Sequence, residues 1–131
     1  MNRIRIYELG TTGDDRGLNL ALPPEALKFV GKVKDVHVSS SISGGVRGNH
    51  YHLRKRRAMV VMPGVAWSLH WDAGKGTAIQ RRSFDGGGVV LLLIPPGASH
   101  AVRNDGNADL WMVACSSAPY DASQVVMRTV V

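Results

Sequence analysis

Several features of common protein classes are scarce or missing in this sequence. A single cysteine, Cys115, stands among 131 residues, so the chain cannot form an internal disulfide bond. Aromatic residues make up only 6% of the chain, and no apolar run is long enough to cross a membrane. The first residues lack the apolar stretch of a secretory signal peptide. We therefore expect a protein of the reducing cytosol, a cytoplasmic protein with no membrane partner, in which Cys115 is buried in the core.

Acidic residues are also few, and this scarcity points to a class of ligand. The chain has 16 lysine and arginine residues against 10 acidic ones, which gives a net charge of +6. A dense group of basic residues with no acid extends from Arg47 to Arg57. A surplus of positive charge favours an anionic partner, although a solvated turn and edge strand would have the same composition. We expect no nucleic-acid partner, because the chain has no recognisable nucleic-acid module and its aromatic residues do not alternate with the basic run.

The residues that are present predict a single all-β domain spanning residues 1–131. Short alternating or continuous apolar segments recur between turns rich in glycine, proline and aspartate, which is typical of sandwiches and barrels. Only the segment from Pro23 to about Phe29 predicts a helix, because proline is well suited to a first helical turn. The predicted strands cover residues 3–9, 18–22, 32–40, 48–52, 57–62, 65–71, 77–84, 89–94, 100–104, 108–116 and 125–131.

Two segments place three histidines where a sheet would bring them together. In Gly48-Asn49-His50-Tyr51-His52 the two imidazoles are two residues apart, so a strand would direct both to one face. Downstream, the turn Pro95-Pro96-Gly97 precedes His100, and Asn104 follows four residues later. Antiparallel neighbours bring same-face Cβ atoms to about 5 Å from each other. Pairing of these strands would therefore gather all three imidazoles in one pocket.

Three converging histidines are compatible with more than one chemistry. Neutral imidazoles hold Zn²⁺ or Fe²⁺ with one coordination position open, which would make His50, His52 and His100 metal ligands. An imidazole also transfers protons near neutral pH. In a third interpretation the histidines are only hydrogen-bonded polar groups inside a barrel. The residues alone leave these alternatives open.

The same two segments resemble the two motifs of the cupin superfamily. The first motif, with His-x-His between glycines, is matched from Gly45 to Gly64, and the second is the Pro-x-Gly turn followed by histidine and asparagine. The resemblance implies a double-stranded β-helix, the cupin jelly roll, here with one short N-terminal helix. Metal-binding cupins add a glutamate ligand shortly after the histidine pair. This chain has Arg56 and Arg57 there, and a guanidinium only donates hydrogen bonds.

Most of the chain also resembles the nucleotide-sugar 3,4-ketoisomerases and 3,5-epimerases that act on dTDP-4-keto-6-deoxyhexoses, and the C-terminal cupin domains of capsule-sugar reductases. The matching segments are Asp15-Arg16-Gly17, Arg47 to His52, and Tyr120-Asp121. The resemblance implies an isomerase or epimerase of surface-polysaccharide or deoxysugar biosynthesis. It would act by proton transfer next to a carbonyl of a nucleotide-linked keto-deoxy sugar, and it would require no cofactor.

The resemblance also implies roles for individual residues. His50 is the expected catalytic base, and His52 is its partner, as an acid or as the group that holds the enediolate. Arg47 or Arg57 would stabilise the oxyanion, and Arg16 would help to hold the pyrophosphate. The remaining expected substrate-binding residues are His100, Asn104 and Tyr120.

Two other functions compete with this prediction. One is a metal-dependent small cupin enzyme that uses the three histidines with Zn or Fe, and the other is a non-catalytic cupin that binds a sugar or another anion. The leading prediction requires a small anionic sugar or nucleotide sugar as partner. Exposed sheet edges and an apolar last strand also favour a homodimer.

Overall fold

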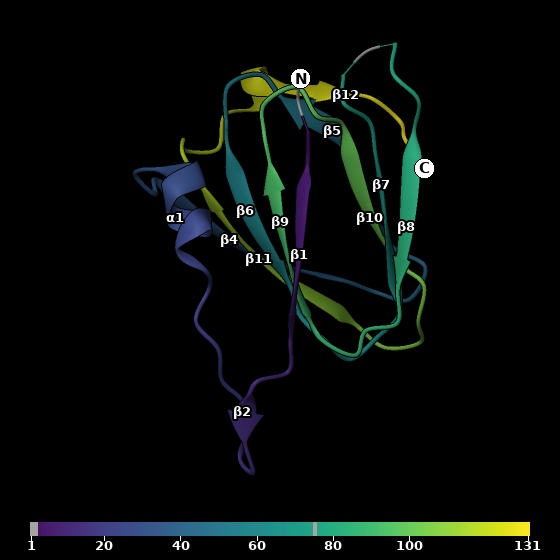
Figure 1. Ribbon diagram of the computed structural model, residues 1–131. Helices are drawn as coiled ribbons and strands as arrows, with labels where there is room; N and C mark the ends of the chain where they lie inside the picture. The colour runs from purple at the N-terminus through teal and green to yellow at the C-terminus, as the bar shows by residue number, and fades with distance from the viewer. Residues whose placement is uncertain (1–2, 75) are drawn as a thin grey trace.

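Two five-stranded antiparallel sheets pack face to face in the computed structural model, which describes residues 3–74 and 76–131 (Figure 1). The first sheet contains, in spatial order, β1 (Arg5–Gly10), β9 (Val89–Ile94), β6 (Arg57–Val61), β11 (Leu110–Ser116) and β4 (Asp35–Ser41). The second contains β12 (Val125–Met127), β5 (Val46–His52), β10 (His100–Asn104), β7 (Trp67–Trp71) and β8 (Gln80–Phe84). This arrangement confirms the predicted all-β jelly roll.

Strand β9 is apolar throughout because both of its faces are covered. Val90, Leu92 and Ile94 point into the core between the sheets, whereas Leu91 and Leu93 point outward and pack under the helix α1 (Pro24–Val30). The helix has a proline in its first turn and ends at Gly31, whose φ of 72° suits glycine. The predicted short helix is therefore present, and it covers the outer face of the first sheet.

The space between the sheets is divided into two unlike halves. Beside β1, β9, β7 and β8 it is filled by a core that includes the stacked rings of Trp67 and Phe84, with centroids 4.2 Å apart. Toward the edge strands β4 and β12 the lining becomes polar and the space is open. The apolar half holds the sheets together, so the other half is available for a site.

Two expected strands keep less than half of their predicted length. In the segment 18–22 only Leu18 belongs to a strand, since the chain there forms the small hairpin β2 (Gly13–Asp14) and β3 (Gly17–Leu18) and then turns into Pro23. The last strand ends at Met127, and the residues after it are held by side chains instead of a sheet ladder. The expectation of a buried Cys115 was wrong: its thiol lies on the outer face of β11 and is half-buried.

None of the helices that the structure describes is long and apolar enough to span a membrane.

Candidate functional site

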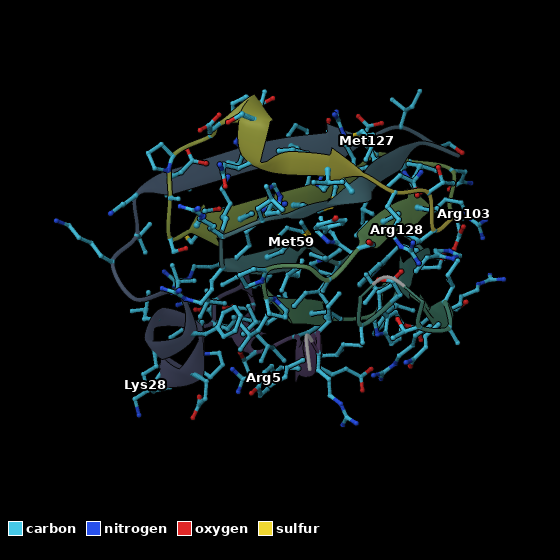
Figure 2. All side chains as sticks on the ribbon, turned by 90° about the horizontal axis from the view of Figure 1, so that it is seen from above. Arg5, Lys28, Met59, Arg103, Met127 and Arg128 are labelled. Carbon is cyan, nitrogen blue, oxygen red and sulfur yellow. The ribbon has the colours of Figure 1, made fainter. Side chains whose placement is uncertain are left out.

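Three imidazoles meet in the polar half of the sandwich. The ring centroids of His50 and His52 are 5.0 Å apart, those of His50 and His100 are 5.2 Å apart, and those of His52 and His100 are 6.3 Å apart. They line a pocket of about 360 Å³ between β4, β5, β6, β10, β11 and β12. Figure 2 looks at the molecule from above, with Met127 on the β12 ribbon and Met59 nearer the centre, and both residues line this pocket. Pockets of this size accommodate small ligands.

A β-bulge in strand β5 sets the positions of the two histidines in that strand. His50 is paired with His100 and Gly48 with Ala101, so Asn49 is the extra residue of the bulge. Gly48 and Asn49 both have positive φ, 116° and 57°. A Cβ at position 48 would collide with the carbonyl oxygen of His100, so this close approach requires glycine. The bulged Asn49 accepts hydrogen bonds from the backbone of Val130 and Val131 and holds the C-terminal segment in place.

The hydrogen bonds fix the tautomers of two of the imidazoles. Nδ1 of His100 lies 3.0 Å from the carbonyl oxygen of Ala98, which only accepts, so His100 carries its proton on Nδ1. Nε2 of His52 lies 3.4 Å from Nη1 of Arg57, which only donates, so neutral His52 is also protonated on Nδ1. In contrast, Nε2 of His50 and Nε2 of His100 are buried and have no hydrogen-bond partner among the described residues.

The pocket keeps its imidazoles neutral. Burial lowers the pKa of His52 and of His100 to about 3, and the positive charge of Arg57 adds to the effect in both. Burial, followed by the charges of Arg57 and Lys55, also lowers the pKa of His50. At neutral pH the three rings are therefore uncharged.

The pocket is also lined by four polar residues that were not expected to belong to the site. Three of them alternate along β4, namely Asp35, His37 and Ser39, and the fourth is Lys55 in the turn after β5. Residues Val36 and Val38 of β4 face outward and are exposed. The alternation in the sequence indicated only that β4 has one polar face. The structure turns that polar face inward, which indicates that the enclosed space is a site and not a core.

The predicted substrate-binding residues are divided between the pocket and the rest of the molecule. Arg57, Arg47 and His100 line the pocket, and Tyr120 lies at its rim with a ring that is 65% exposed. The Arg47 guanidinium donates two hydrogen bonds to the backbone oxygen of Ser40, at 3.0 and 2.8 Å. Arg47 therefore has fewer donors left for a ligand than Arg57 has.

Asn104 and Arg16 lie outside the pocket. The amide of Asn104 is buried, donates to the backbone oxygens of Ser41 and Ala108, and accepts from the amide of Gly106, so it holds a turn and has nothing left for a substrate. Arg16 is exposed in the β2–β3 hairpin and is paired with Asp14. This hairpin projects from the end of the sandwich away from β5 and β12 (Figure 1). Within this chain, neither residue is placed to bind the ligand of the pocket.

The donor set does not fit a metal ion. Among residues 3–74 and 76–131, no three His, Cys, Asp or Glu side chains are arranged to hold a metal. The lone pair of His52 Nε2 faces the Arg57 guanidinium, which remains cationic and opposes a divalent ion beside it. Of the predicted Zn or Fe ligands His50, His52 and His100, His52 therefore has no nitrogen free to bind a metal. The set also lacks the carboxylate that metal-binding cupins use.

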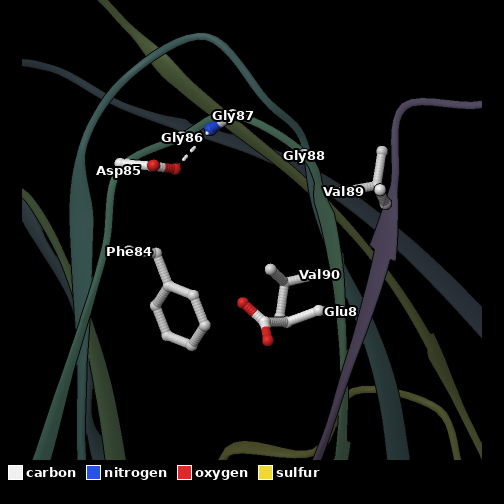
Figure 3. Close-up of a pocket in the computed structure, with 9 residues that line it drawn as sticks. Glu8, Phe84, Asp85, Gly86, Gly87, Gly88, Val89 and Val90 are labelled. Atoms are coloured by element: carbon white, nitrogen blue, oxygen red, sulfur yellow. Dashed lines mark hydrogen bonds between the residues drawn. The ribbon is translucent and has the colours of Figure 1, made fainter.

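Two other hollows differ from this pocket in chemistry. One adjoins the histidine pocket, shares His52, Lys55 and Tyr120 with it, and extends over Arg54 and Gln124 with a volume of about 660 Å³. The other lies at the loop before β9, where Asp85 accepts a hydrogen bond from the amide of Gly87 at 2.8 Å (Figure 3). Its titratable side chains are the carboxylates of Glu8 and Asp85, and no basic residue is among the described residues that line it, so it does not suit an anionic ligand.

Several solved structures have the same fold as this chain. CapF, the capsular polysaccharide assembling protein from Staphylococcus aureus, is 22% identical with a TM-score of 0.65, over 73% of this chain and 28% of CapF. A dTDP sugar isomerase from Desulfovibrio desulfuricans is 15% identical with a TM-score of 0.77, over 97% of this chain and 84% of that protein. A mutant of the 3,4-ketoisomerase QdtA from Thermoanaerobacterium thermosaccharolyticum has been solved in complex with TDP-4-keto-6-deoxyglucose. It is 13% identical with a TM-score of 0.69, over 94% of this chain and 86% of QdtA.

The chain thus spans little more than a quarter of CapF and most of the length of the two isomerases. No curated protein matches its sequence. A family model described as the polysaccharide biosynthesis C-terminal domain matches residues 13–125, which include every strand that lines the pocket except the end of β12. The chain therefore has the predicted cupin fold and belongs to the polysaccharide biosynthesis C-terminal domain family.

Proposed function

We propose that this protein is an isomerase or epimerase that acts by proton transfer next to a carbonyl of a nucleotide-linked keto sugar. One observation carries the proposal: Nε2 of His50 is buried in a cationic pocket and has no hydrogen-bond partner among the residues that the structure describes. In the tautomer with its proton on Nδ1, a neutral His50 presents at Nε2 the free lone pair that a general base requires. The family and the similar sugar isomerases support the same class of reaction. Keto-deoxy sugars are the substrates that the sequence resemblance implies.

The reaction divides among the pocket residues as follows. The carbon–hydrogen bond beside the carbonyl breaks, its proton passes to Nε2 of His50, and the electron pair moves onto the carbonyl oxygen to give an enediolate. The positive charges of Lys55 and Arg57 stabilise this oxyanion. Return of the proton from His50 to the former carbonyl carbon, with transfer of the enol hydroxyl proton to the former carbonyl oxygen, moves the carbonyl and gives an isomer. An epimer forms when the original carbon instead receives a proton from the opposite face of the sugar ring. His52, protonated on Nδ1, acts as a hydrogen-bond donor and not as a second base.

The adjoining hollow supplies a place for the nucleotide. It opens from the histidine pocket past Lys55 and is lined by the exposed ring of Tyr120 and by Arg54. An exposed aromatic ring can stack against a nucleobase, and basic side chains bind diphosphate oxygens. The sugar would then lie in the histidine pocket, with Lys55 between the two parts of the ligand. The expected homodimer and the cytoplasmic location remain predictions.

A thermal-shift titration with dTDP, UDP, GDP and inorganic phosphate tests this proposal. A ligand at a hundred times its dissociation constant stabilises the fold by about 2.7 kcal/mol, so one nucleoside diphosphate should raise the melting temperature by several degrees. Arg54→Gln should reduce that shift, whereas Lys28→Gln, in helix α1 and outside the lining of both hollows, should not. A response to divalent metal, with none to any nucleotide, would instead support a metal-dependent cupin.

A further inference from the structure

The histidine pocket contains more fixed positive charge than a neutral sugar requires. Arg47, Lys55 and Arg57 line it, and Asp35 is its only carboxylate. Asp35 lies 3.6 Å from Nδ1 of His37, and neither Lys55 nor Arg57 forms a salt bridge with any residue of 3–74 or 76–131. The charge of Asp35 acts on both Lys55 and Arg57 from beyond salt-bridge distance, but one carboxylate does not balance the cations of the pocket. An excess of enclosed positive charge is unfavourable, so a bound anion would compensate it.

Arg57 is the cation at the centre of this excess. Its guanidinium is largely enclosed. Within residues 3–74 and 76–131, its Nε–H is buried without a hydrogen-bond partner and its one side-chain hydrogen bond joins Nη1 to His52 Nε2 at 3.4 Å. A guanidinium has five donors in a planar fork, and a carboxylate satisfies two of them in parallel. An enediolate oxygen, which forms only during the reaction, would use one of them. The unused donors of Arg57 therefore match an anionic group that is present in the bound ligand from the start.

The position of Arg57 distinguishes this anion from the diphosphate of a nucleotide. Arg57 contacts His52 and lies inside the pocket, whereas the cation that extends into the adjoining hollow is Arg54. Lys55 lines both spaces. A diphosphate that bound between Lys55 and Arg54 would leave the donors of Arg57 free for the sugar itself.

We infer that the substrate is an acidic keto sugar, whose ring carries a carboxylate that Arg57 binds beside the reacting carbon. The inference rests on the proposed function, and it places a carboxylate where a neutral 6-deoxy sugar has its methyl group. Arg57 acts here as the residue that determines specificity. Lys55 remains available for the oxyanion that forms at the carbonyl.

Calorimetric titration with two matched pairs of probes tests the inference. One pair is UDP-glucuronate and UDP-glucose, and the other is free glucuronate and glucose, so each pair differs only by the carboxylate. The wild type should bind the acid of at least one pair roughly tenfold or more tightly than its neutral counterpart, as expected for hydrogen bonds to a charged group. Arg57→Gln should abolish that preference. Arg54→Gln should weaken both UDP sugars by the same factor, and Lys28→Gln should change neither.

The outcomes separate this inference from the proposed function. Equal binding of acid and neutral sugar, no binding of either acid, or a preference that survives in Arg57→Gln would each overturn the carboxylate site, even if nucleotides bind as proposed. An Arg57-dependent preference for free glucuronate, with no response to any nucleotide, would support the carboxylate site and contradict the nucleotide-linked substrate.

Discussion

The histidines that make the site are also groups whose protonation the fold opposes. His100 is 1% exposed and His52 is 6% exposed, and both have a folded-state pKa of about 3 against 6.5 for an ordinary histidine. Between these values the unfolded chain binds protons that the folded chain does not. Their contribution to stability is therefore complete above pH 6.5 and is lost progressively as the pH falls toward 3.

This difference predicts acid sensitivity that can be assigned to single residues. Each of the two histidines should lower the free energy of unfolding by about 2 kcal/mol between pH 7 and pH 5, because each pH unit below 6.5 costs about 1.4 kcal/mol. Urea unfolding at both pH values measures the loss. In His100→Gln the loss should be smaller by the contribution of one histidine, while Lys28→Gln, at an exposed position of helix α1, should match the wild type. An equal loss in all three proteins would show that the buried imidazoles do not carry the effect.

At the scale of elements, the bulge in β5 is the feature on which the site depends. It brings β5 so close to β10 that only a glycine fits at position 48, and the extra residue Asn49 sets which side of the strand His50 and His52 share. Without the bulge, the pairing of His50 with His100 would shift by one residue and one face of β5 would exchange with the other.

Gly48→Ala should therefore be far more harmful than the same change at another glycine with positive φ. We expect a loss of at least about 3 kcal/mol, since the new Cβ meets the His100 carbonyl in a backbone conformation that only glycine adopts easily. The matched control is Gly44→Ala, where φ is 76° and nothing lies within 4 Å, and it should cost about 1 kcal/mol. Urea unfolding compares the two. Similar losses would mean that the close approach of β5 and β10 is not what requires glycine.

The elements also explain which parts of this structure were predictable from the sequence. Strand β9 and the segment from Gly48 to His52 have local patterns that dictate their conformation, so their positions were predicted well. Residues 18–22 and 128–131 are as apolar as true strands, but their pairing depends on distant partners: Asp72 and Asn49 hold the C-terminal segment.

The same distinction applies to the site. The convergence of the three histidines followed from spacing and strand pairing. The contribution of β4 did not, because nothing in an alternating segment tells which of its faces turns inward. Asn104 was expected to bind substrate on the basis of a motif, and its hydrogen bonds to the backbone show that in this chain it holds a turn.

At the scale of the whole molecule, the sandwich separates stability from chemistry. The half around Trp67 and Leu92 is packed and apolar, while the half beside β4 and β12 encloses neutral imidazoles and unpaired cations. This second half would be unfavourable without a ligand. The division is consistent with a protein whose central activity is to remove a proton from a bound anionic sugar.

Solvent exchange measures that activity most directly. The protein is incubated in D₂O with dTDP-4-keto-6-deoxyglucose and, separately, with UDP-4-keto-glucuronate, and deuterium next to the carbonyl is followed by NMR. The account predicts incorporation with at least one substrate, and a rate reduced by about 10² to 10⁴ in His50→Gln but not in Lys28→Gln. Binding of both sugars without any incorporation, or an unchanged rate in His50→Gln, would contradict it.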